Sequence, residues 1–216
     1  MSRRASIDRS VFMTINRLPH SRPLDQRVSL LSDLGEGVGW AAGAAWLAVR
    51  DGARGRRAAG ASVGAMLVAT VLVQGLIKGA LGRRRPFVDR AVRVVGRRPR
   101  DASFPSGHTA GSFAAAVALS CFYPRDAPML LGTATAVGAS RIYLGMHFPG
   151  DVLAGAGLGA ALGLVAHRLL RSRNSDRAPA AAVDREGVPE GGRDRLPFSR
   201  RSPAAPGASG RRPPPP

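Results

Sequence analysis

Residues 104–109 read Phe-Pro-Ser-Gly-His-Thr and stand directly before a long apolar run. Ser106 is a residue type favoured at helix N-caps, so we expect a helix to begin at Gly107. The first turn of that helix carries backbone N–H groups without intrahelical partners and a partial positive charge, which together favour an anion. His108 adds a side chain that can transfer a proton. This stretch is therefore the candidate centre of an anion-binding site.

Five apolar runs organise the rest of the chain. A helix that crosses a bilayer needs about 17–25 residues, and each run is adequate, although the first is short and carries Glu36. The runs are rich in Gly and Ala, which lets membrane helices approach closely. A buried soluble core is the alternative, but five such runs would leave almost no polar face. The runs have these limits: Asp33–Val49, Ala58–Leu81, Gly107–Tyr123, Pro128–Leu144 and Gly150–Leu170.

The composition divides the chain into three segments. Residues 1–34 contain an amphipathic stretch interrupted by Pro19 and Pro23, which we expect to lie on the bilayer surface. Residues 35–171 hold the apolar runs, and residues 172–216 are rich in Arg, Pro, Gly and Ser, a composition typical of disorder. The predicted fold is an all-α membrane bundle of about five transmembrane helices with an N-terminal interfacial helix.

The net charge of +18 comes almost entirely from arginine, since Lys78 is the single lysine among 216 residues. Strong basicity is typical of proteins that bind nucleic acid, an anionic membrane surface or a phosphate-bearing ligand. No basic helix, zinc spacing or aromatic stacking platform indicates nucleic acid. Because the arginines punctuate the apolar runs, the membrane interpretation is favoured. The lone Cys121 excludes an internal disulfide.

Two basic stretches supply cations for the anion site. Lys78 and Arg85 are seven residues apart, roughly 10 Å along a helix, so we expect them on one helix face, with Pro86 ending that helix. A lysine in an apolar run is usually functional, although it can also extend to the interface. Arg141 adds a guanidinium suited to bidentate phosphate binding. Three cations can hold a phosphate and the extra charge of its transition state, so a metal is unnecessary.

A second histidine supplies a nucleophile. His147 and Asp151 are four residues apart, and Pro149 suits the first turn of a helix. Asp151 is placed to accept a hydrogen bond from one imidazole nitrogen of His147, which leaves the other nitrogen free to attack phosphorus. His108 is then the general acid for the leaving oxygen and later the base for water.

Topology predicts that these stretches meet. Residues 78–86 close the second apolar run, Ser106 opens the third, and residues 140–151 join the fourth to the fifth. If successive helices alternate in direction, all three stretches lie at the same membrane surface. This agreement does not depend on any motif.

The three stretches also resemble the signature of a known family, the type 2 phosphatidic acid phosphatase (PAP2) superfamily, over roughly residues 7–170. The family includes bacterial undecaprenyl-diphosphate phosphatases, phosphatidylglycerophosphate phosphatases, glucose-6-phosphatase and vanadium haloperoxidases. Every signature position is filled, in order. The matching motifs are Lys78-x6-Arg85-Pro86, Pro105-Ser106-Gly107-His108 and Ser140-Arg141-x5-His147-x3-Asp151.

The resemblance implies a phosphatase that needs no metal or other cofactor and works through a phosphohistidine. Its substrate is expected to be a lipid phosphate or diphosphate, either a polyprenyl phosphate or diphosphate of the kind that serves cell-wall synthesis or a glycerolipid phosphate. His108 is implied as the acid, His147 as the nucleophile and Asp151 as its orienting partner. The implied phosphate-binding residues are Lys78, Arg85, Ser106, Gly107, Ser140 and Arg141.

Sidedness is where two arguments disagree. The many arginines near the motifs favour a cytoplasmic motif face by the positive-inside rule, whereas the resemblance implies an extracytoplasmic site in the cell membrane. We expect the extracytoplasmic arrangement, because arginines close to a phosphate site can be retained for the ligand. Arg83, Arg84, Arg97 and Arg98 fit either a diphosphate or sugar-phosphate head group or a solvated face against anionic lipid.

Several other functions fit the sequence less well. A cysteine-dependent phosphatase needs an arginine six residues after its cysteine, but Cys121 is followed by Arg125. A serine hydrolase built on Ser106 would lack its Gly-x-Ser-x-Gly motif and leave the cations without a purpose. A vanadate-dependent haloperoxidase would use the same anion pocket, usually in a larger soluble chain. A non-enzymatic transporter or scaffold would tolerate the spans but would not require His147 four residues before Asp151.

Overall fold

The computed structural model describes residues 3–88 and 92–175, and these residues form helices and loops without a strand. All of them fall in one compact unit. The all-α prediction is confirmed for this part of the chain. The predicted disorder of residues 172–216 was wrong for residues 172–175, which continue the last helix, and the tail from 176 onward lies outside the described residues.

The predicted interfacial segment consists of two helices, α1 (Arg3–Asn16) and α2 (Arg22–Asp33). Ser21 caps α2 by accepting a hydrogen bond from Leu24 N at 3.4 Å. The helix does not end after α2, despite Gly35 and Gly37, and continues through a π-helical segment, Leu34–Val38, into α3 (Gly39–Arg50). The first expected span therefore begins inside a longer helix, which kinks at Gly37.

The remaining helices match the other four apolar runs closely. Short 3-10 turns lie at Pro86–Val88 and Pro124–Asp126. In chain order, the helical elements are α4 (Gly52–Val71), a π-helical segment (Leu72–Ile77), α5 (Lys78–Leu81), α6 (Gly107–Phe122), α7 (Ala127–Tyr143) and α8 (Pro149–Ser175).

Among the described residues, two helices are long and apolar enough to cross a membrane. They are the continuous helix Gly52–Leu81, of 30 residues and mean hydropathy 1.9, and Pro149–Arg171, of 23 residues and mean hydropathy 1.5. The helices α6 and α7 have 16 and 17 residues, at the short end of the length that a span needs. The count of five spans therefore stays a prediction.

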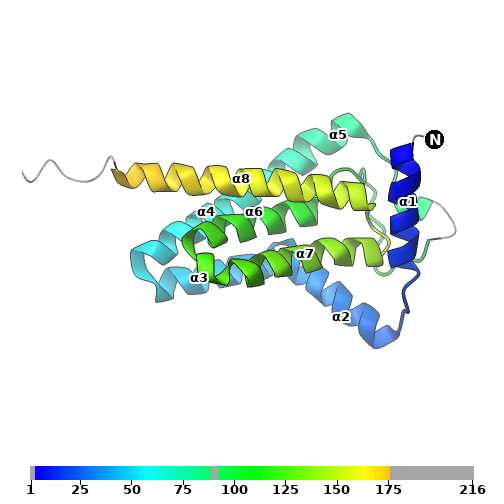
Figure 1. Ribbon diagram of the computed structural model, residues 1–216, viewed down its shortest axis with the longest axis horizontal. Helices are drawn as coiled ribbons and strands as arrows, with labels where there is room; N and C mark the ends of the chain where they lie inside the picture. The colour runs from blue at the N-terminus through cyan, green and yellow to red at the C-terminus, as the bar shows by residue number, and fades with distance from the viewer. Residues whose placement is uncertain (1–2, 89–91, 176–216) are drawn as a thin grey trace, which may run out of the picture. The chain divides into compact units, whose positions relative to one another are not determined.

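Helix α6 lies at the centre of the bundle and packs against α4, α7 and α8 (Figure 1). Gly155, Gly159 and Gly163 of α8 lie one turn apart and face the α6 backbone. A Cβ at Gly155 would approach Ser106 O to 2.5 Å, and one at Gly159 would approach Ala110 O to 2.2 Å. This glycine stripe allows the two helices to pack at backbone contact distance.

The connection between Lys78 and Arg85 differs from the expectation of one helix face. Helix α5 ends at Leu81, because Gly82 adopts a left-handed conformation with φ 50°. Arg85 therefore lies beyond the helix, and Pro86 starts a separate 3-10 turn instead of ending α5. The prediction of a shared helix face was wrong, since the glycine ends the helix before the proline can.

The N-terminal helices are attached to the end of the bundle where α7 ends and α8 begins. Phe12 of α1 is buried against Phe148, with ring centroids 5.3 Å apart. Asn16 Nδ2 donates to Tyr143 O at 3.0 Å, and Tyr143 Oη donates to Asp25 of α2 at 2.8 Å. The N-terminal segment is therefore part of the structure around the predicted site.

Candidate active site

The two cations of the first motif meet at one carboxylate. Lys78 and Arg85 are both buried, and each pairs with the side chain of Asp101. The Arg85 Nη2 to Asp101 Oδ1 distance is 2.7 Å, and Arg85 Nε donates to Asp101 O at 2.9 Å. Burial raises the pKa of Asp101, but pairing with Lys78 and Arg85 outweighs it and lowers the pKa overall. Asp101 is therefore ionised and holds both cations at one place.

Ser106 caps α6 as the sequence predicts. Its buried Oγ accepts hydrogen bonds from Thr109 N at 3.4 Å and from Thr109 Oγ1 at 2.9 Å. Ser106 N donates to Asp151 O at 3.0 Å, which joins the start of α6 to the start of α8. Gly107 and His108 follow in the first turn, where a helix presents N–H groups to an anion.

His147 lies in the loop between α7 and α8 and is 2% exposed. Its Nε2 is 3.3 Å from Arg85 Nη1, and its Nδ1 is 3.7 Å from Asp151 Oδ2, longer than a hydrogen bond. Burial, together with the charges of Arg85 and Arg141, outweighs the raising effect of Asp151 and lowers the pKa of His147 to about 4. The imidazole is therefore neutral at neutral pH, as a nucleophile must be.

Asp151 is fully buried and is held by three donors. Arg83 Nη1 donates to Oδ1 at 2.6 Å, while Ser103 Oγ and Phe148 N donate to Oδ2 at 2.5 and 2.9 Å. Arg83 also donates to Asp8 of α1 at 2.6 Å. These contacts fix the carboxylate beside His147.

Arg141 and Ser140 close the site from α7. Both are buried; Arg141 Nη1 donates to Ser32 Oγ at 2.6 Å, and Ser140 Oγ donates to the backbone of Val137 at 2.6 Å. Arg141 Nε has no hydrogen-bond partner among the described residues. An unpaired buried guanidinium nitrogen is costly, so it suits an anion such as phosphate.

His108 has a partner that the sequence did not indicate. Its Nε2 lies 3.4 Å from Glu36 Oε2, in the π-helical segment between α2 and α3. Glu36 is 63% exposed, so it connects the imidazole with solvent. A carboxylate in this position can stabilise the protonated imidazole that a general acid requires.

The structure thus brings the three predicted stretches together at one end of the bundle. Arg85 Nη1 also donates to Met146 O at 3.0 Å, which joins the first motif to the third. The sequence missed the residues that hold the predicted ones. Of these, Arg83 stood out only as one arginine in a basic run, and Glu36 only as a charge in the first apolar run. The others carried no signal: Asp8, Ser32, Asp101 and Ser103.

The chain is similar in sequence to a known protein family and to several of its members. The sequence model of the PAP2 superfamily matches residues 59–175, more than half of the chain. The chain is 38% identical over 109 residues to lipid A 1-phosphatase of Rhizobium johnstonii, which covers 45% of this chain and 44% of that protein. It is 35% identical over 136 residues to decaprenylphosphoryl-5-phosphoribose phosphatase of Mycobacterium tuberculosis, which covers 62% and 74%. The chain thus spans about half the length of the lipid A phosphatases it matches.

Solved structures that resemble this one include two bacterial membrane phosphatases. Aquifex aeolicus LpxE has a TM-score of 0.62 and 27% identity, covering 74% of this chain and 93% of that chain. The PAP2-type phosphatidylglycerolphosphate phosphatase of Bacillus subtilis has a TM-score of 0.58 at 22% identity, covering 82% and 89%, a likeness of fold. Together with the match of the sequence model, these likenesses show that the chain belongs to the PAP2 superfamily.

Proposed function

We propose that this protein is a membrane phosphatase that hydrolyses a lipid phosphate or diphosphate through a phosphohistidine at His147, without a metal ion. One observation carries the proposal. The buried, neutral imidazole of His147 points its Nε2 at the guanidinium of Arg85, at the N-terminal end of α6. A nucleophile beside a fixed cation is the arrangement that phosphoryl transfer needs.

Binding depends on the fixed positive groups. Lys78, Arg85 and Arg141 would hold the phosphate oxygens, with the first-turn N–H groups of α6 and the hydroxyls of Ser106 and Ser140 around them. The phosphate must compete with the Asp101 carboxylate for Lys78 and Arg85. Asp101 is 38% exposed, so it can leave the two cations without crossing the core.

The reaction would proceed in two displacements. In the first, His147 Nε2 attacks phosphorus, the bond from phosphorus to the leaving oxygen breaks, and His108 gives its proton to that oxygen. In the second, water attacks the phosphohistidine, His108 takes a proton from the water, and the nitrogen–phosphorus bond breaks to release phosphate. Asp151 stabilises the positive charge that develops on His147.

The substrate class follows from the family and from the relatives. Those relatives are named as a lipid A 1-phosphatase, a decaprenylphosphoryl-5-phosphoribose phosphatase and an undecaprenyl-diphosphatase. For this chain we propose a polyprenyl phosphate or diphosphate, of the kind that serves cell-wall synthesis, or a glycerolipid phosphate. All of these join an anionic phosphate to long hydrocarbon.

We propose that five helical spans place the site on the extracytoplasmic side of the cell membrane. All three motifs lie at one end of the bundle, and the basic segment Arg50–Arg57 lies at the other end of α3 and α4. In a Cys121→Ser background, a membrane-impermeant thiol reagent added to intact cells should label Arg97→Cys and spare Ala53→Cys. The reverse pattern would place the site in the cytoplasm.

The activity is tested with protein purified in detergent. A panel of lipid phosphates, containing undecaprenyl diphosphate, a polyprenyl monophosphate and phosphatidic acid, is assayed for phosphate release in the presence of EDTA. We expect activity in EDTA and its loss by at least a hundredfold in His147→Ala, since His147 is the proposed acceptor of the phosphoryl group. Activity that disappears in EDTA, or that His147→Ala retains, contradicts the mechanism.

A further inference from the structure

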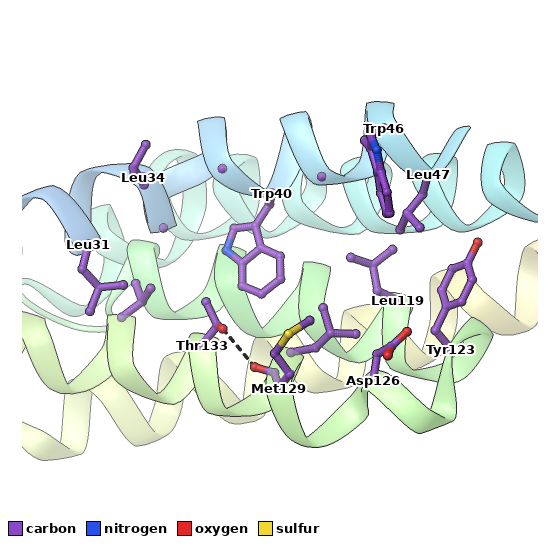
Figure 2. A pocket seen from close by; sticks show the side chains of 15 residues that line it. Leu31, Leu34, Trp40, Trp46, Leu47, Leu119, Tyr123, Asp126, Met129 and Thr133 are labelled. Atoms are coloured by element: carbon purple, nitrogen blue, oxygen red, sulfur yellow. Dashed lines mark hydrogen bonds between the residues drawn. The ribbon is translucent and has the colours of Figure 1, made fainter. Parts of the chain in front are cut away.

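An apolar groove runs along the bundle between α3 and α7, with α6 as its floor (Figure 2). Its volume is about 420 Å³. Trp40 and Trp46 reach into it from α3, and Met129 and Thr133 line it from α7. Thr133 Oγ1 donates to Met129 O at 2.9 Å, so the hydroxyl of Thr133 already has a hydrogen-bond partner within α7. The groove therefore offers almost only hydrocarbon to whatever occupies it.

We propose that this groove holds the hydrocarbon chain of the lipid phosphate substrate. The inference rests on the proposed phosphatase function and adds the place where the lipid lies. An apolar surface facing a bilayer gains little from burial alone, since lipid tails are as apolar as the groove. Selectivity for the substrate must come from its connection to the phosphate site.

That connection is short at one end of the groove. Leu31 and Gly35 line the groove, and the residue after each one contacts the site. Ser32 accepts a hydrogen bond from Arg141 at 2.6 Å, and Glu36 lies 3.4 Å from His108. Val137, on the facing wall, accepts a hydrogen bond from Ser140. Gly35 packs directly against Val137 at this end, so a chain attached to a bound phosphate would reach the groove past the half-buried Leu31.

The other end lies near polar side chains of the opposite surface. Tyr123 lines the groove there, and its hydroxyl donates to Asp51 at 2.8 Å. Trp46 lies under Arg50, whose guanidinium carbon is 4.9 Å from the ring centroid. From Leu31 to Trp46 the helix rises about 20 Å, most of a bilayer's apolar thickness. The groove therefore suits a long chain lying parallel to the helices.

Tethering explains why the substrate's own chain would occupy the groove in place of bulk lipid. Once the phosphate is bound, the attached chain has a high effective concentration at the groove mouth, which free lipids do not share. The wall is also fixed, because Trp40 Nε1 donates to Ser112 Oγ at 3.2 Å. A rigid groove loses little order on binding and can discriminate between chains by shape.

A second apolar cavity gives a matched control. It has a volume of about 360 Å³ and lies between α4 and α8, lined by Gly64, Val68 and Leu162, far along both helices from Lys78 and Pro149. A Cβ added at Gly43 of the groove, or at Gly64 of this cavity, meets no atom within 4 Å. Both glycines line their cavities and leave room for a first side-chain carbon, so a phenylalanine at Gly64 is the matched control for one at Gly43.

The test compares Gly43→Phe with Gly64→Phe on substrates that share a head group and differ in chain length. The pairs are undecaprenyl and geranyl diphosphate, and dipalmitoyl and dihexanoyl phosphatidic acid. We expect Gly43→Phe to raise KM for the long member of the hydrolysed pair by about tenfold and to leave the short member unchanged. Gly64→Phe should change neither. The short substrate also shows that each variant is folded.

Each other outcome overturns the inference. An unchanged ratio of long- to short-chain kcat/KM in Gly43→Phe means that the chain lies elsewhere. The same result with a loss of dimer in size-exclusion chromatography assigns the groove to a second copy of this chain. An equal effect of Gly64→Phe shows a general effect on the bundle. A wild-type protein that hydrolyses neither member of either pair contradicts the proposed function itself, and the inference with it.

Discussion

Several ionised side chains in the site are each paired with a group that balances the charge. Lys78 and Arg85 share Asp101, and Asp151 is held by Arg83 together with two neutral donors. A buried charge without a partner is strongly destabilising, so each ionised group needs its counterpart. The sequence showed the groups that contact phosphate, but the residues that balance them come from distant positions.

The first residue-scale prediction concerns pH. His147 must be neutral to attack, and burial lowers its pKa from 6.5 to about 4. We therefore expect the acid limb of kcat/KM for a soluble aryl phosphate to fall well below pH 6. Between pH 6.5 and 4 the unfolded chain takes up a proton at His147 that the folded protein does not. The free energy of unfolding should thus decrease as the pH falls through that window. An acid limb near pH 6.5 in kcat/KM, without a matching change in substrate binding, would contradict the lowered pKa of His147.

The second residue-scale prediction concerns Arg83, which holds Asp151 in position beside His147. Arg83→Ala removes a donor from Asp151 and another from Asp8. We expect kcat to fall by about tenfold, with a smaller change in KM, because Asp151 acts through His147. With less positive charge around Asp151, the pKa of His147 rises, and the acid limb of kcat/KM moves to higher pH. Arg56→Ala, at an exposed position of α4 far from the motifs, is the control and should change neither. A drop in kcat with an unmoved acid limb would assign Arg83 a structural role alone.

Helices α6 and α8 show how an element positions the site. The glycine stripe of α8 lies against the α6 backbone, and Gly155 faces the carbonyl of Ser106 itself. The close approach brings Ser106 N within 3.0 Å of Asp151 O. Packing in the middle of the bundle thus sets the separation between the anion-binding helix start and the carboxylate behind His147.

The element-scale prediction uses two neighbouring glycines. In Gly159→Val, the Cβ would come to 2.2 Å from Ala110 O and 2.9 Å from Ala114 N, so α8 must move away from α6. We expect a loss of at least about 2 kcal/mol, read as a lower thermal midpoint in detergent, together with lost activity. Gly157→Val, whose Cβ meets no atom within 4 Å, should leave both unchanged. Equal midpoints for the two variants would show that the stripe does not set the packing.

Elements were predictable where the sequence carried a strong local signal. The apolar runs and the Ser106 cap predicted α6 and α7 to within one residue, and they predicted the start of α8 but not its end at Ser175. Gly82 was the exception, because the sequence does not show whether a glycine inside a helical pattern adopts a left-handed conformation. Here Gly82 does so and ends α5 ahead of Pro86. The uninterrupted passage from α2 into α3 was missed for the converse reason, since the two glycines beside Glu36 did not stop the helix.

At the scale of the whole molecule, alternation of the helices predicted that the three motifs would meet, and contacts of Arg85 with Met146 and of Ser106 with Asp151 confirm it. What the sequence could not predict is the contribution of α1. Asp8 belongs to none of the three motifs, yet it accepts hydrogen bonds from Arg83 and from Gly150 N. Such contacts join positions more than seventy residues apart, and no local pattern encodes them.

The central claim is that His147 takes the phosphoryl group before water does. The most direct test is the stereochemical course of hydrolysis, measured with a substrate made chiral at phosphorus by oxygen isotopes. Two in-line displacements, one by His147 and one by water, predict retention of configuration at phosphorus. Inversion would show a single direct attack by water and would contradict the role assigned to His147.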